Sequence, residues 1–94
     1  MRLSPAQINL LKTTTQQLDK NARVFLFGSR TDDTKTGGDI DLLILSEQLS
    51  KQHLRTIKWQ FYEAFGEQKI DIIIDSGKLE SPFVRLIFPT AIEL

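Results

Sequence analysis

The chain has 94 residues, 40% of them hydrophobic, which is enough for one compact domain with a single core. Twelve basic residues balance twelve acidic ones, so no overall charge attracts the chain to nucleic acid or to an anionic membrane. There is no cysteine and only one histidine, His53, which excludes disulfide frameworks, thiolate metal sites and histidine-rich zinc sites.

The N-terminus lacks the apolar segment of a signal peptide, and no stretch approaches the ~20 apolar residues that span a bilayer. We therefore expect a cytoplasmic protein that does not contact the membrane. Its length predicts a single domain over residues 1–94.

The first element expected is a helix over residues 5–18. Ser4 can accept a hydrogen bond from a free backbone N–H, and Pro5 loses no hydrogen bond at the first helical position. Apolar residues then recur near helical spacing at Ile8, Leu11 and Leu18. The threonines at 13–15 lower helix propensity, so packing should hold this helix as a cover for the core.

Two strands with a polar loop between them are expected next. Residues 23–27 follow a turn at 20–22 and are almost continuously apolar, which predicts a central strand buried on both faces. The second strand is expected over residues 39–45. A short helix can follow Ser29 before the glycines and polar residues return the chain to a loop.

An amphipathic helix is expected after the second strand and should end at Gly66. Its apolar stripe has spacings of three and four and consists of Leu54, Ile57, Phe61, Ala64 and Phe65. Trp59 and Tyr62 lie off this stripe. They are either ordinary, partly buried aromatic residues or part of a partner interface, where such residues are enriched.

The third strand is expected over residues 69–75. Its alternation puts three isoleucines on one face and Asp71, Ile73 and Asp75 on the other. A short helix over 82–88 should follow, and residues 91–94 should form an edge strand or a tail.

Residues 24–44 carry the features that point to chemistry. Asp39 and Asp41 are two apart on a strand and project from one face, while Ile40 points to the other. Two such charges repel by roughly 4 kcal/mol at ~4 Å and an effective dielectric near 20, and a shared divalent cation removes that repulsion. Asp71 from another strand completes three carboxylates, an oxygen set suited to Mg²⁺. Without the metal, at least one of these carboxyls should have a raised pKa.

Gly28, Ser29 and Arg30 add a candidate phosphate site. Gly28 lets the backbone approach a ligand, and N–H groups at the start of a following helix favour phosphate oxygens. The Ser29 hydroxyl can donate to the same oxygens and Arg30 adds positive charge. Together with the carboxylates, this arrangement suits in-line attack on a nucleotide phosphorus.

Each feature also has a structural interpretation. Gly28 and Ser29 can be an ordinary turn, and the two aspartates a capped, solvated strand edge. Asp71 can be a structural residue in a salt bridge with Lys69 or Arg85. The occurrence of all these features together, in this order, favours the chemical interpretation.

These residues resemble the nucleotidyltransferase superfamily of DNA polymerase beta type, whose signature is Gly-Ser, a spacer, Asp-x-Asp and a later strand Asp. Here the corresponding residues are Gly28, Ser29, Asp39, Asp41 and Asp71. The stretch GSRTDDTKTGGDIDLLI and the small size are similar to the minimal nucleotidyltransferases, and the resemblance covers nearly the whole chain.

The resemblance implies an α/β (α+β) fold in which a small mixed β-sheet is flanked by helices. It also implies Mg²⁺-dependent transfer of AMP from ATP, with Asp39, Asp41 and Asp71 as catalytic and metal-binding residues and with Gly28, Ser29 and Arg30 at the nucleotide phosphates. Members of this group commonly pair with a helical protein of the HEPN class as the antitoxin of a toxin–antitoxin pair, and some attach AMP to a tyrosine of that toxin.

We expect adenylyl transfer onto a protein, with a HEPN-class partner as the acceptor. The alternative is a non-catalytic antitoxin or binding module that neutralises its partner by complex formation, for which Trp59, Tyr62 and Phe83 offer candidate contacts. Transfer onto an aminoglycoside-like molecule or an RNA end is less favoured, because no basic patch or extra substrate domain is present in these residues. Direct nucleic-acid binding is not expected.

The sequence does not decide between a monomer and a homo-oligomer. Asp71 is the candidate general base that would take the proton of the acceptor.

Overall fold

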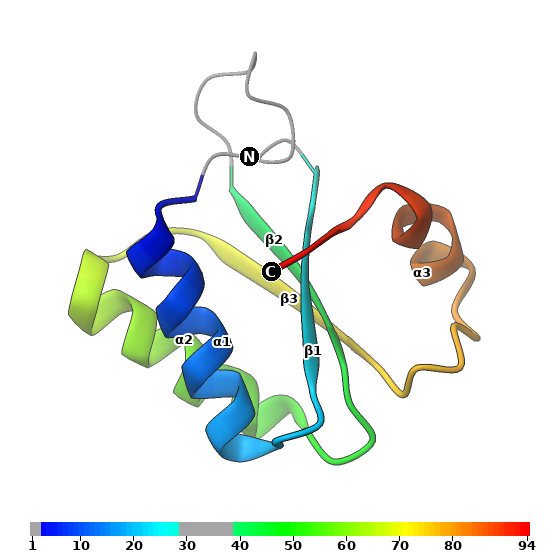
Figure 1. Cartoon of the computed structure of the whole chain (residues 1–94), viewed down its shortest axis with the longest axis horizontal. Coiled ribbons are helices and arrows are strands. Elements are labelled where there is room, and N and C mark those ends of the chain that lie inside the picture. Colours follow the sequence, from blue (N-terminus) through cyan, green and yellow to red (C-terminus); the bar gives the residue numbers. More distant parts are fainter. Residues whose placement is uncertain (1–2, 29–38) are drawn as a thin grey trace.

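A computed structural model describes residues 3–28 and 39–94 of the chain. It is a small α+β structure in which a four-stranded mixed sheet is flanked by helices (Figure 1), as the sequence resemblance implies. The helices and strands follow in the order α1 (Pro5–Leu18), β1 (Arg23–Phe27), β2 (Ile40–Leu45), α2 (Lys51–Phe65), β3 (Ile70–Asp75), α3 (Pro82–Ile87) and β4 (Ile92–Glu93). None of the helices in the described ranges is long and apolar enough to cross a membrane.

The sheet has the strand order β3-β2-β1-β4, so β1 and β2 are its central strands. β1 pairs antiparallel with β2 and with β4, whereas β2 and β3 run parallel and are joined through α2. The predicted burial of residues 23–27 on both faces is confirmed, because Val24 and Phe27 are both at most 8% exposed and face opposite sides.

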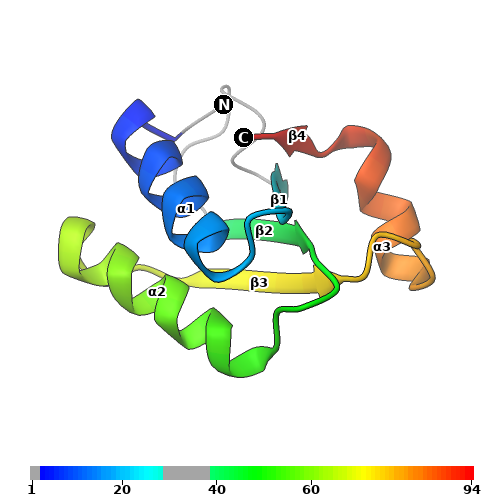
Figure 2. The same cartoon turned by 60° about the horizontal axis from the view of Figure 1, so that its bottom comes forward.

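Two separate clusters of apolar side chains cover the two faces of the sheet. On one face, α1 and α2 pack against alternate residues of the strands, with Leu11, Ile57 and Phe61 at the centre of that cluster. On the other face, Val84 of α3 packs against Leu43 and its neighbours. Figures 1 and 2 show α1 and α2 together on one side of the sheet and α3 on the other. The strands β1, β2 and β3 therefore each offer one face to each helix layer.

At the starts of α1 and α2, polar side chains accept hydrogen bonds from backbone N–H groups. The Ser4 hydroxyl accepts from the N–H of Gln7, whose side chain accepts from the N–H of Ser4, so the predicted start of α1 is confirmed. At α2 the N–H of Ser50 donates to His53 Nδ1 at 3.0 Å. The first turn of α2 is polar, so the apolar stripe that predicts this helix from the sequence starts only at Leu54, three residues after the helix begins.

Several element boundaries differ by one residue from those predicted, and one predicted buried side chain is exposed. The second and third strands begin one residue later than predicted, and the short helix ends at Ile87 before a 3₁₀ turn over Phe88–Thr90. The C-terminal segment is an edge strand, held on β1 by a hydrogen-bonded ion pair of Arg23 with Glu93. Phe65, expected on the buried stripe of α2, is 39% exposed. The short helix expected after Ser29 lies outside the described residues.

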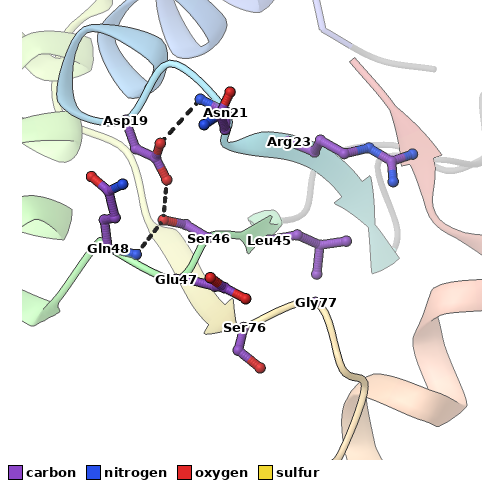
Figure 3. A pocket seen from close by; sticks show the side chains of 9 residues that line it. All are labelled: Asp19, Asn21, Arg23, Leu45, Ser46, Glu47, Gln48, Ser76 and Gly77. Carbon is purple, nitrogen blue, oxygen red and sulfur yellow. Dashed lines mark hydrogen bonds between the residues drawn. The ribbon is translucent and has the colours of Figure 1, made fainter.

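A buried carboxylate ties the end of α1 to the end of β2 (Figure 3). The Ser46 hydroxyl donates to Asp19 Oδ2 at 2.6 Å and accepts from the N–H groups of Gln48 and Leu49. The Asp19 carboxylate also accepts from the N–H of Asn21. These hydrogen bonds, that of Ser46 first, hold the pKa of Asp19 below its ordinary value.

Replacing Ser46 should therefore weaken the fold. We expect Ser46→Ala to lower the free energy of unfolding by about 2 kcal/mol, because it leaves buried polar groups without partners. Urea unfolding measures this loss. Ser76→Ala, which removes an exposed hydroxyl nearby, is the matched control and should change stability by less than about 0.5 kcal/mol. Equal effects of the two changes would contradict a structural role for Ser46.

Candidate active site

Asp41 and Asp71 are direct partners in the parallel ladder between β2 and β3. Neighbouring strands are ~4.8 Å apart, and partner residues point to the same face of a sheet. That face is the one covered by α3, because Leu43 and Ile73, which follow two residues later on each strand, belong to its apolar cluster. The register thus brings together two of the three predicted carboxylates from positions thirty residues apart.

The proximity of these charges perturbs Asp41. Partial burial raises the pKa of the Asp41 carboxyl, and the negative charges of Asp71 and Asp39 raise it further, while Lys69 acts in the opposite direction. A raised pKa in at least one of these carboxyls is the outcome that the sequence predicted. Among the described residues, the positive charge of Lys69 therefore does not fully compensate the negative charge at this end of β2.

Asp39, the third predicted carboxylate, lies just before β2 and contacts a lysine. Lys69 Nζ lies 3.4 Å from Asp39 Oδ2, and both side chains are partly exposed to solvent. The hydrogen bond to Asp39, followed by the charges of Asp39, Asp71 and Asp41, raises the pKa of the Lys69 ammonium group. The Lys69 ammonium group thus interacts electrostatically with all three carboxylates.

The predicted alternative for Asp71, a structural salt bridge, has no counterpart among the described residues. Lys69 pairs with Asp39, and the Arg85 guanidinium donates to the backbone carbonyl of Glu80. Sequence reasoning considered Lys69 only as a partner of Asp71 and missed its place in the site. Lys69 lies just before β3, thirty residues after Asp39, and no local pattern in the sequence links the two.

The donor atoms suit a hard divalent cation. Mg²⁺ is bound in proteins through one or two carboxylates together with waters and substrate phosphates, and Asp41 and Asp71 supply such a pair. Across residues 3–28 and 39–94, no three His, Cys, Asp or Glu side chains are grouped so that they could hold a metal ion. Asp39 is turned to Lys69 instead, so a metal-binding role for all three carboxylates stays a prediction.

Gly28, at the end of β1, approaches the carboxylate of Asp41 closely. Its φ of +79° lies in the left-handed region that favours glycine, and an added Cβ would collide with the Asp41 side chain. Glycine is therefore required here by conformation and by space. Ser29 and Arg30, the other two predicted phosphate-binding residues, lie outside the described residues.

A pocket of about 300 Å³ lies at the other end of β2 (Figure 3). Its lining combines the Asp19 and Ser46 network with parts of neighbouring loops, in full Asp19, Asn21, Arg23, Leu45, Ser46, Glu47, Gln48, Ser76 and Gly77. β2 begins beside Asp41 and ends at Leu45, so this pocket is separate from the carboxylates. Within this lining, the Asp19 and Ser46 side chains are hydrogen-bonded to each other and to backbone N–H groups, which gives this part of the pocket a structural role.

Comparison with known families identifies the domain. The model of the family described as "Nucleotidyltransferase domain" matches residues 8–93. The match includes every residue of the site described above. No curated protein matches the chain.

The close approach of Gly28 to Asp41 leads to a stability prediction. Gly28→Ala should cost about 1–3 kcal/mol from backbone strain and at least about 1 kcal/mol more because the Asp41 side chain must move. Gly66→Ala is the matched control, since Gly66 has a similar φ of +87° but open space around it. Urea unfolding of both variants compares the costs. Equal losses would contradict the contact with Asp41.

The raised pKa of Asp41 leads to a pH-dependent prediction in metal-free buffer. A raised pKa means that the folded chain binds the Asp41 proton more tightly than the unfolded chain does. Protonation of Asp41 therefore stabilises the fold, and this stabilisation is lost as pH rises through the pKa of the folded state. Asp41→Asn should therefore stabilise the protein at pH 7, by less than about 1 kcal/mol because the side chain is partly solvated. The gain should vanish near pH ~3, where aspartates are mostly protonated.

Thermal unfolding at the two pH values measures the difference between Asp41→Asn and the native chain. Glu63→Gln, an exposed change on α2, should have no comparable effect at either pH. A loss of stability of Asp41→Asn at pH 7 would show that the carboxylate is well compensated.

Proposed function

Because the chain belongs to the nucleotidyltransferase domain family, we propose that it transfers AMP from ATP to a protein acceptor in a Mg²⁺-dependent reaction. The proposed acceptor is a helical partner of the HEPN class, for which this chain serves as the antitoxin. Nucleotidyl transfer itself is the activity of the family; the donor, the metal and the acceptor are the proposal. The observation that carries it is the pair of in-register carboxylates, Asp41 and Asp71, beside the backbone of Gly28.

Each group in the site has a proposed task. Asp41 and Asp71 would hold the cation. Gly28 has no side chain, so its backbone would be able to approach the phosphates closely. When bound, Mg²⁺ neutralises charge on the phosphate oxygens and on the leaving pyrophosphate. In the family signature, Ser29 and Arg30 would contact the same phosphates.

The proposed transfer step forms one bond to phosphorus, breaks another, and moves one proton from the acceptor hydroxyl. The acceptor hydroxyl oxygen bonds to the α-phosphorus of ATP, the bond from that phosphorus to the bridging oxygen breaks, and pyrophosphate leaves. The hydroxyl proton passes to Asp71. This carboxylate is exposed and lies on β3, the edge strand of the sheet, where a second protein can approach.

A protein acceptor also requires a surface for it. Four large apolar side chains are exposed in the described part of the chain, Trp59, Phe65, Phe83 and Leu86, and Trp59 is 63% exposed. Exposed aromatic residues of this kind are enriched in protein interfaces. Among them, Trp59, Phe65 and Leu86 support a protein acceptor over a small molecule.

The direct test uses ATP labelled at the α-phosphate. We expect the native chain with Mg²⁺ to label a HEPN-class protein encoded beside its gene, and we expect chelation of Mg²⁺ to abolish labelling. Asp41→Asn should reduce the rate by about 100-fold or more, because bound metal contributes several kcal/mol to such reactions. Asp75→Asn is the matched control, because Asp75 lies on the same strand and face as Asp71 but binds only the N–H groups of the following turn. Undiminished labelling by Asp41→Asn would overturn the proposal.

A second candidate function is neutralisation of the partner by binding alone. The ion pair of Asp39 with Lys69 favours it, because it engages one of the three signature carboxylates that a catalytic cation site would use. An Asp39→Asn, Asp41→Asn double variant that fully counteracts the partner in cells would support this candidate, whereas a variant that has lost this ability supports the enzyme.

A further inference from the structure

The carboxylates continue a row of side chains that crosses the sheet. Phe27 of β1 is the direct antiparallel partner of Asp41, and Asp41 is the direct parallel partner of Asp71. Directly opposed residues share a face and have Cβ atoms about 5 Å apart. Phe27, Asp41 and Asp71 therefore stand side by side on the face that α3 covers.

α3 extends this row by one more ring. The centroid of the Phe83 ring lies 6.0 Å from that of Phe27, with an edge-to-face angle of 73°. Phe27 is 8% exposed, whereas Phe83 is 47% exposed. Starting from the carboxylates and moving toward β1, the first ring is thus covered by protein and the second is open to solvent.

Phe83 differs in position from the other exposed aromatic residues. Trp59 and Phe65 lie on α2, which packs against the opposite face of the sheet. Within residues 3–28 and 39–94, Phe83 is therefore the exposed aromatic ring on the carboxylate face. On the other side of the carboxylates the sheet ends at the edge strand β3, so no further strand offers a ring there.

We propose that Phe83 is the surface on which the base of the nucleotide substrate stacks. The proposal rests on the proposed nucleotidyl transfer, because it takes the phosphates to lie at Asp41 and Asp71. A nucleotide carries its base one sugar away from the α-phosphate, so the base must find a surface beside the carboxylates. A planar base and an exposed phenylalanine ring stack favourably, and the edge-to-face contact with Phe27 holds the ring of Phe83 in place.

This mode of binding has a consequence for specificity. Stacking tolerates any base, because every base has a π-face, and it reads none of the hydrogen-bonding groups at the base edge. Phe83 would thus bind adenine and guanine by the same means. The loss of the ring should weaken the binding of ATP and GTP by similar factors.

The test compares a nucleotide with its phosphate chain alone. Isothermal titration calorimetry in the presence of Mg²⁺ measures the binding of ATP, GTP and inorganic tripolyphosphate. Phe83→Leu, which keeps apolar cover on Phe27, should weaken the binding of both nucleotides by about tenfold and leave that of tripolyphosphate unchanged. Phe83→Tyr should keep the native affinity for all three, because it retains the ring.

Phe65→Leu is a matched control. Phe65 is 39% exposed and packs against a buried phenylalanine, Phe61, at a centroid distance of 5.0 Å, but it lies on the other face of the sheet. It should leave nucleotide affinity unchanged. Equal losses from Phe65→Leu and Phe83→Leu would overturn the proposal, as would a loss of tripolyphosphate binding in Phe83→Leu.

The outcomes also separate this inference from the function on which it rests. If the native chain binds ATP and tripolyphosphate while Phe83→Leu binds ATP as tightly as the native chain, the base site is wrong and the nucleotide site stands. A native chain that binds neither ligand overturns both. A Phe83→Leu variant that alters only self-association, measured by sedimentation, shows that Phe83 is an interface residue and overturns the base site.

Discussion

Two like charges are held side by side in this protein by the register of a parallel strand pair. The backbone of Asp41 cannot move away from that of Asp71 without a shift of β2, and a shift by one residue would turn every side chain of the strand to the opposite face. The neighbours of Asp41 on β2 are fully buried on both sides, from Ile40 to Ile44. Burial of this strand in two apolar layers therefore holds the carboxylates together, although their electrostatic interaction is unfavourable.

The electrostatics of the site agree with the proposal that it binds a ligand. Partial burial and two nearby carboxylates raise the pKa of Asp41, and Lys69 offsets only part of that charge. An added Cβ at Gly28 would meet the Asp41 carboxylate, so a larger residue fits there only if the Asp41 side chain moves. Such an arrangement lowers stability in the free protein and is retained where function requires it. A cation with nucleotide phosphates would supply positive charge beside Asp41 and Asp71.

Much of the fold could be predicted because local patterns and tertiary burial agree. Ser4 and Pro5 predict the start of α1. The alternation of Ile70, Asp71 and Ile72 correctly predicts which side chains of β3 face the same side of the sheet. The site was less predictable. Sequence spacing put Asp39 beside Asp41, but a lysine that precedes another strand contacts Asp39, and no local pattern reveals a partner thirty residues away. The exposure of Phe65 was missed for a related reason, because helical spacing shows which residues share a face but not where the neighbouring layer ends.

The central claim is that the in-register carboxylates form the cation site of a nucleotidyltransferase. Paramagnetic broadening of backbone amide signals by Mn²⁺, an oxygen-seeking substitute for Mg²⁺, tests it most directly. At low Mn²⁺ the amide signals of Asp41 and Asp71 should broaden first, and those of Ser46 and Gly77, at the other end of the same strands, should broaden last. Broadening that is equally strong at both ends, or strongest at Ser46 and Gly77, would contradict the account.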